Sequence, residues 1–166
     1  LDFERGSSHM VEHMAFDNSK QFPGRGGTWR QISQGGIGSF NAYTSFRSTV
    51  YMFLDVINDG KTGLTTEAGG QTSNTDETVL ADNIKKMMNI FYSQVQEAKF
   101  MDAYLQIEKG AVLGEARMRN SSASIALEQM LSNHGGNSWR VGQRYPIGTQ
   151  PIIKSWTVEH LHNYYQ

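Results

Sequence analysis

The pentapeptide HMVEH constrains this chain more than any other feature, because its polar residues can act together only if the segment is helical. His9 and His13 are four residues apart, so an α-helix places both imidazoles on one face, where they can converge on one metal ion. Glu12 projects close to the same point without having to be a ligand. Zinc binds neutral imidazole readily, and a carboxylate beside zinc-activated water is the usual general base of hydrolysis. The segment therefore predicts a helix with a hydrolytic zinc site.

Two simpler interpretations of the pentapeptide stand beside this one. Two histidines on a surface helix can be solvated and bind nothing. The letters GSSHM at positions 6–10 also resemble the remnant of an expression tag, although VEHMAF follows them without a break. The order His-x-x-Glu-His matches the inverted form of the commoner metalloprotease signature.

A further ligand is expected, because two histidines do not complete a zinc site. Glu108 and Glu115 lie seven residues apart, nearly two helical turns, so both carboxylates share one face of a helix. One could bind the metal while the other orients it or its histidine partners. Charge patterning alone favours a solvated acidic edge instead, in which Glu115 pairs with Arg119 at i,i+4.

Hydrophobic periodicity and turn residues predict the elements of the chain. Strands are expected over 40–46 and 49–57, where Phe40, Ala42, Thr44 and Phe46 share one side of the first strand. Five helices are expected, over 8–16, 79–95, 101–120, a shorter stretch through 125–131 that ends at His134, and 157–165. Ser7 or Ser8 is expected to cap the first of them, and Thr157 the last. The remaining segments, 17–34, 58–78 and 142–154, are rich in polar residues, Gly and Pro and are predicted to be loops.

This pattern indicates an α+β fold, a two-layer sandwich with helices packed on one face of a mostly antiparallel sheet. Its 166 residues are enough for a single domain, 1–166, with a real core. The low-hydrophobicity segment 58–78 is too long for an ordinary connection, so we expect an exposed insertion loop there.

Composition excludes several classes of function. The net charge is −1 and no basic run is present, so nucleic acid is not expected as a partner. No apolar stretch approaches the ~20 residues that span a bilayer. The chain has no cysteine, which removes disulfides, thiol catalysis and Cys-ligated zinc.

Three segments, in order, carry a family resemblance. HMVEHMAF, GGIGSFNAYTSFRSTVYMF and IEKGAVLGEARMRN resemble the pitrilysin/insulinase family of zinc metallopeptidases, and YPIGTQPIIKSWTVEHLHNYY is similar to the end of that family's first repeat. The resemblance implies that His9, His13 and Glu115 bind Zn²⁺ and that Glu12 is the general base. It also implies that Glu108 supports the site without binding the metal itself.

The same resemblance implies a substrate and a partner. A peptide or unfolded polypeptide would add as an extra strand to the edge formed by FNAYTS, where Asn41 and Ala42 offer backbone groups and the Asn41 amide could bond the substrate. Judged from its type alone, Asn41 is an ordinary strand-end residue. Active members of the family also use a second homologous half or subunit that closes over the substrate.

The chain departs from the family pattern in two places. The strands that normally precede the zinc helix are missing, so a truncated domain is expected. The separation of His13 from Glu115 is long, which the 58–78 insertion would explain.

The alternative function is a non-catalytic scaffold or core subunit of the same family, although the four intact site residues favour a peptidase. A small-molecule metallohydrolase is a third hypothesis. The other histidines are expected to be surface or packing residues: His134, His160 and His162.

Overall fold

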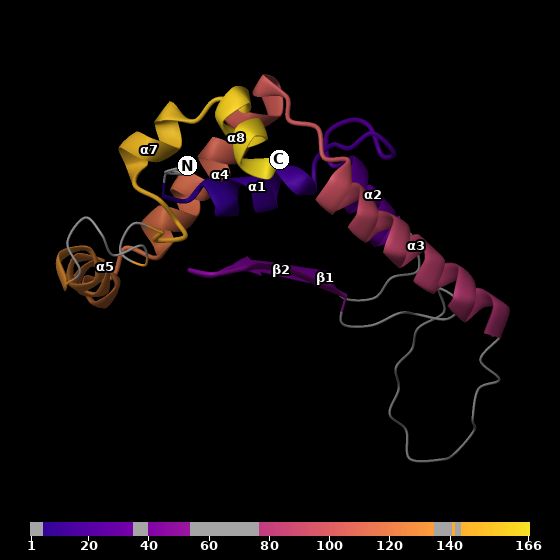
Figure 1. Ribbon diagram of the computed structural model, residues 1–166, viewed down its shortest axis with the longest axis horizontal. Coiled ribbons are helices and arrows are strands. Elements are labelled where there is room, and N and C mark those ends of the chain that lie inside the picture. Colours follow the sequence, from indigo (N-terminus) through magenta and orange to yellow (C-terminus); the bar gives the residue numbers. More distant parts are fainter. Residues whose placement is uncertain (1–4, 35–39, 54–76, 135–140, 142–143) are drawn as a thin grey trace, which may run out of the picture.

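The computed structural model describes residues 5–34, 40–53, 77–134, 141 and 144–166. In this part of the chain, helices lie on one face of an antiparallel hairpin (Figure 1), as the α+β two-layer class predicts. The elements are α1 (Ser7–Ala15), α2 (Gly27–Gln34), β1 (Phe40–Thr44), β2 (Thr49–Phe53), α3 (Glu77–Gln96), α4 (Asp102–Met118), α5 (Ser122–His134), α7 (Gln150–Ser155) and α8 (Val158–Tyr165). Among the described helices, none combines the length and apolarity that crossing a bilayer requires.

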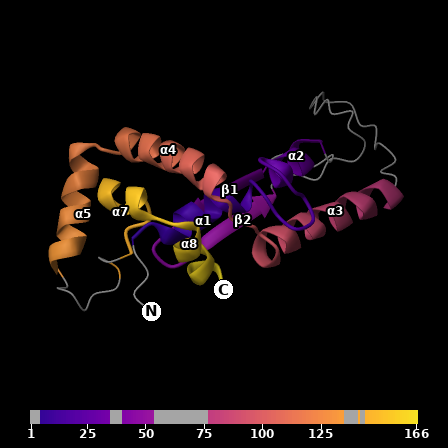
Figure 2. The ribbon, with the colours of Figure 1, turned by 90° about the horizontal axis from the view of Figure 1, so that it is seen from above.

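Helix α1 is the centre of the structure. All of its residues except Ser8 and His13 are buried. Figure 2, which looks down on the molecule, shows α1 and α8 over the hairpin in the middle, with α5 at one end and α3 at the other. The main core joins α1 to α4, α7 and α8 through a set of buried apolar side chains: Met10, Val11, Met14, Leu105, Val112, Ile153, Trp156 and Leu161. A helix buried on nearly every side must provide partners for its polar residues.

The hairpin covers the opposite side of α1. Phe40 lies opposite Phe53, and Thr44 opposite Thr49, while Ser45 N–H donates to Ser48 O across the turn at 2.8 Å. Burial alternates along β1, with Phe40, Ala42 and Thr44 half-buried and the residues between them exposed, as predicted from the period of two. The rings of Phe40 and Phe53 join a second core cluster with Ile32 of α2 and Ile90 of α3.

Two helices lie within segments predicted to be loops. Helix α2 occupies the end of the 17–34 segment, and the prediction of loop there is wrong. The helix is only eight residues long and mostly polar, and its only buried apolar side chain is Ile32, so the segment resembles a loop in composition. Helix α7 lies within the turn-rich 142–154 stretch and extends one residue past it; Pro151 is in its first turn, where a missing N–H costs no helical bond.

The helix ends test the predicted caps. Thr157 caps α8 as predicted, with its Oγ1 accepting from His160 N–H at 3.1 Å. The serine cap predicted for α1 is wrong: the N-cap is Gly6, and Ser7 Oγ instead lies 2.9 Å from His160 Nε2.

Residues 54–57 of the second predicted strand lie outside the described residues. So does the insertion predicted at 58–78, apart from its last two residues, which begin α3.

The start of α1 requires glycine for two reasons. Gly6 has φ = 82°, and a Cβ at this position would lie 2.9 Å from backbone atoms of Gly148, which itself has φ = 74°. These two left-handed residues allow the α1 N-terminus to touch the 147–149 segment.

We therefore expect Gly6→Ala to lower the free energy of unfolding by roughly 1–3 kcal/mol, through backbone strain and a backbone clash. The matched control is Gly110→Ala, on the exposed side of α4 with open space around it, which should raise that free energy by about 1 kcal/mol because alanine favours helix. Urea denaturation of both variants measures the two effects, and equal signs would contradict the account.

Candidate metal centre and adjoining cavity

The two histidines of α1 face each other across one helical turn. Their Nε2 atoms are 3.3 Å apart, and the rings meet edge to face with centroids 4.7 Å apart. His9 is 6 % exposed, and His13 lies at the edge of a cavity. Helical spacing alone brings these two imidazoles together, as the pentapeptide predicts.

Helix α4 brings Glu115 to the same point, although this residue follows His13 by 102 positions. Its Oε2 lies 3.5 Å from His9 Nε2, and its Oε1 lies 3.4 Å from His13 Nε2. Packing of Leu105 and Val112 into the core holds α4 against α1. Among the described residues, this trio is the group of possible ligands whose donor atoms come close enough to share a metal ion.

The spacing of these donors fits zinc. Four ligands at about 2.0–2.1 Å from a tetrahedral zinc ion lie about 3.3–3.4 Å from one another. The nitrogen–nitrogen distance is 3.3 Å, and the nitrogen–oxygen distances, which involve the two different oxygens of Glu115, are 3.4 and 3.5 Å. One donor atom from each residue lies within 4.8 Å of the other two, close enough to share one ion. Two imidazoles and one carboxylate are also a ligand set of catalytic zinc sites, which leave the fourth position to water or substrate.

The protonation of the histidines differs with their surroundings. Burial, followed by the charges of His13 and Arg119, lowers the pKa of His9 to about 3, so His9 is neutral near pH 7 and able to bind a metal. Burial also acts to lower the pKa of His13. The hydrogen bond from His13 Nδ1 to the Glu108 carboxylate and the charge of Glu115 outweigh it, and the pKa of His13 is raised overall.

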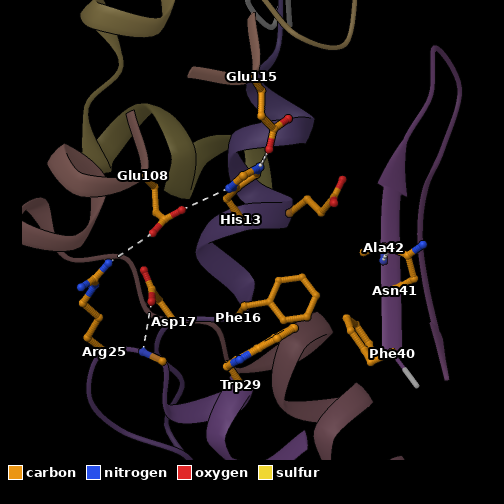
Figure 3. Close-up of a pocket in the computed structure, with 12 residues that line it drawn as sticks. His13, Phe16, Asp17, Arg25, Trp29, Phe40, Asn41, Ala42, Glu108 and Glu115 are labelled. Atoms are coloured by element: carbon orange, nitrogen blue, oxygen red, sulfur yellow. Dashed lines mark hydrogen bonds and ion pairs between the residues drawn. The ribbon is translucent and has the colours of Figure 1, made fainter. Parts of the chain in front are cut away.

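Glu108 contacts the His13 ring on the side away from the other two candidate ligands, His9 and Glu115. Its Oε2 lies 3.1 Å from His13 Nδ1, an arrangement that directs His13 Nε2 toward Glu115 (Figure 3). Its Oε1 is 4.0 Å from a guanidinium nitrogen of Arg25. The Glu115–Arg119 pair expected from charge patterning is also present, at 3.6 Å, so Glu115 faces a cation as well as the histidines.

Glu12 lies next to the trio without belonging to it. The residue is 8 % exposed, and its Oε2 accepts a hydrogen bond of 2.5 Å from the Thr44 hydroxyl, whose Oγ1 is also 3.0 Å from Thr49 Oγ1. Burial raises the pKa of Glu12, and the bond from Thr44 opposes that rise. Sequence reasoning missed Thr44 as a site residue. The only indication in the sequence was that Thr44 shares one side of the predicted strand with Phe40 and Ala42.

A cavity of about 760 Å³ opens beside these residues (Figure 3). His13, Glu108 and Glu115 lie at one end, and the rings of Phe16, Trp29 and Phe40 at the other. Glu12 also lines the cavity. Its volume is typical of binding sites for small ligands or peptide segments.

Asn41 and Ala42 of β1 also line the cavity. Asn41 Oδ1 accepts from Ala42 N–H at 2.9 Å, so this N–H points away from β2, toward the edge of the hairpin. In this conformation the Asn41 amide occupies the backbone donor that was expected to bind substrate.

The remaining histidines are outside the trio. His160 contacts Ser7, His162 lies 3.3 Å from Gln166, and His134 is exposed at the end of α5. These positions fit the packing and surface roles expected for them.

Comparison with known proteins identifies relatives of the whole chain. The profile of the insulinase family (peptidase family M16) matches residues 2–66. The chloroplastic stromal processing peptidase of Arabidopsis thaliana is 24 % identical over 163 residues, which are 98 % of this chain and 11 % of that protein. The probable zinc protease PqqL of Haemophilus influenzae is 28 % identical over 171 residues, covering 99 % of this chain and 16 % of the relative. The chain thus spans between about a tenth and a sixth of the length of these curated relatives.

Solved structures share the fold. The first half of the periplasmic protease PqqL from Escherichia coli superposes with a TM-score of 0.69 at 24 % identity, over 98 % of this chain and 30 % of that one. A mutant of the ferredoxin protease FusC, in complex with Arabidopsis ferredoxin, gives a TM-score of 0.75 at 24 % identity, over 100 % of this chain and 16 % of that one. The profile match and the relatives above make the chain similar in sequence to proteases of the insulinase family, peptidase family M16, and it shares its fold with the first half of one such protease.

Proposed function

We propose that this chain is the zinc-binding part of a metalloendopeptidase. The observation that carries the proposal is the convergence of His9, His13 and Glu115 at distances that suit one zinc ion, with Glu12 beside them at the end of a cavity. Relatives that are named zinc proteases support the same chemistry. The activity belongs to the whole protein, of which a second homologous half would form the other wall of the site.

In the proposed reaction, Glu12 is the general base. A zinc ion held by the trio would supply a Lewis acid that acidifies water and polarises the scissile carbonyl. The Glu12 carboxylate takes a proton from the attacking water and delivers it to the leaving amine. Its raised pKa suits both transfers, because a base with a pKa nearer neutrality can also act as the acid. Thr44 holds the carboxylate in place through its hydroxyl.

The substrate would be an extended polypeptide paired with β1. The Ala42 N–H points to the edge of the hairpin and would donate to a substrate carbonyl once the Asn41 amide turns aside. That movement frees the Asn41 side chain to bond the peptide. Backbone pairing of this kind holds the scissile bond near the metal with little demand on sequence.

The burial of Glu12 weighs against the scaffold alternative. A carboxylate that is 8 % exposed and bonded to one hydroxyl costs folding free energy. A scaffold gains nothing from that cost, whereas a general base needs a raised pKa at this position.

Glu12→Gln should abolish hydrolysis while zinc remains bound. Glutamine keeps an oxygen for the Thr44 hydroxyl but cannot accept the water proton, so we expect turnover of a fluorogenic peptide by the full-length protein to fall roughly 10²–10⁴-fold. Metal analysis of the same preparation should give one zinc per chain. Retained turnover would exclude Glu12 as the base.

Glu115→Ala should lower the zinc content of the purified protein well below one per chain, because only two imidazoles remain. The matched control is Glu159→Ala, which removes an exposed carboxylate from α8 and should leave zinc stoichiometric. Full zinc content in Glu115→Ala would show that another residue is the third ligand.

Thr44→Val should reduce kcat about tenfold or more with little change in KM, because the Glu12 carboxylate loses the hydroxyl that donates to it while the β-branched shape is kept. Thr44→Ser restores a hydroxyl and should recover most of the loss. A Thr44→Val enzyme with unchanged kcat would mean that Glu12 needs no anchoring by this side chain.

A further inference from the structure

The cavity has a wall of three aromatic rings. Phe16 packs edge to face against Phe40 and Trp29, with centroids 4.8 and 5.9 Å away, and Trp29 lies 6.4 Å from Phe40. Trp29 is 52 % exposed although it belongs to this cluster. A tryptophan with half its surface in solvent at the side of a cavity offers a ring face to a ligand.

Asp17 follows Phe16, the C-cap of α1, and lines the cavity between Glu108 and Phe16 in the view of Figure 3. Only 7 % of the residue is exposed. Its Oδ1 accepts from Gly26 N–H at 3.0 Å, but its Oδ2 has no hydrogen-bond partner in the described part of the chain. A buried carboxylate oxygen without a partner is costly, so this atom favours a ligand that brings a donor.

The loop that carries Asp17 is firmly held. Asp17 O accepts from Gly27 N–H at 2.6 Å, Asn18 Oδ1 from Gly24 N–H at 2.8 Å, and Ser19 Oγ from Phe22 N–H at 2.9 Å. Three consecutive residues therefore tie the 17–27 loop together. Asp17 is fixed in place instead of being free to turn toward solvent.

The charges that line the cavity leave one carboxylate unbalanced. Glu12 and Glu115 adjoin the candidate metal, whose two positive charges would offset them. Glu108 is bonded to His13 and faces Arg25. Among the described residues, no cation lies within ion-pair distance of Asp17, and Arg25 is directed to Glu108 with 55 % of its side chain exposed. Asp17 is thus the carboxylate on the cavity wall that lacks an ion-pair partner among the described residues; burial and the charge of Glu108 raise its pKa, while the hydrogen bond from Gly26 N–H and the charge of Arg25 act to lower it.

We propose that this cavity binds a lysine or arginine side chain of the polypeptide substrate, with Asp17 as the residue that selects it. The aliphatic part of such a side chain would pack on Phe16 and Trp29, and its cationic end would approach Asp17. A purely apolar side chain would leave the buried Asp17 Oδ2 without a hydrogen-bond donor, and an acidic one would be repelled. This subsite rests on the proposed peptidase function, because a peptide paired with β1 is what directs a side chain into the cavity.

Peptide binding tests the subsite separately from turnover. The probes are two fluorescein-labelled decapeptides, uncharged apart from one central lysine, which is norleucine in the second peptide. Fluorescence anisotropy is measured with zinc-loaded, full-length protein carrying Glu12→Gln, so that nothing is cleaved. We expect the lysine peptide to bind about tenfold more tightly than the norleucine peptide.

Two substitutions assign the preference to Asp17. Adding Asp17→Asn keeps the acceptor for Gly26 N–H and should bring the lysine-to-norleucine ratio close to one. Adding Arg25→Gln removes the competing cation and should raise the ratio. The control Asp102→Asn removes the same charge from the exposed start of α4 and should leave the ratio unchanged.

Equal binding of the two peptides to the parent protein, no binding of either, or a lysine preference that survives Asp17→Asn would overturn the subsite. None of these results bears on whether Glu12 drives hydrolysis. Conversely, a protein without peptidase turnover that keeps an Asp17-dependent lysine preference would retain the subsite and lose the proposed function.

Discussion

The structure depends on the burial of polar side chains along α1. A helix enclosed by α4 and α8 on one side and by a hairpin on the other must pair every polar group that it buries. His9 meets Glu115 of α4, Glu12 meets Thr44 of β1, and His13 is bonded to Glu108 of α4. The contacts that pair these groups also assemble the candidate site, although His9 Nδ1 has no hydrogen-bond partner among the described residues. Folding and the proposed function therefore share one set of interactions.

The parts of the site that follow from helical spacing could be predicted from the sequence. His9 and His13 converge because four residues make one turn, and Glu108 and Glu115 share a face because seven make two. Thr44 and Asp17 could not be predicted, because their roles depend on which element packs against which. Helix α2 was also missed, since it is short, polar in composition and directly follows a Gly-rich stretch, and Ile32 is its only buried apolar side chain.

One continuous segment connects the proposed chemistry with the proposed selectivity. Helix α1 carries the histidines and Glu12, and its C-terminal end leads directly into Phe16 and Asp17 on the cavity wall. The loop that follows is held by backbone N–H groups that donate to the side chains of Asp17, Asn18 and Ser19, and it ends at the start of α2, which carries Trp29. A shift of α1 would therefore move the ligands and the cavity wall together, which suits a site that must hold a peptide bond in register with a base.

Zinc K-edge X-ray absorption of the zinc-loaded protein tests the central claim most directly. The account predicts one zinc per chain, with about two imidazole nitrogens and at least one carboxylate oxygen at about 2.0–2.1 Å. Loss of the imidazole scattering on His13→Ala would tie that shell to α1. A zinc surrounded only by oxygen, or a protein that retains no zinc at neutral pH, would contradict the account.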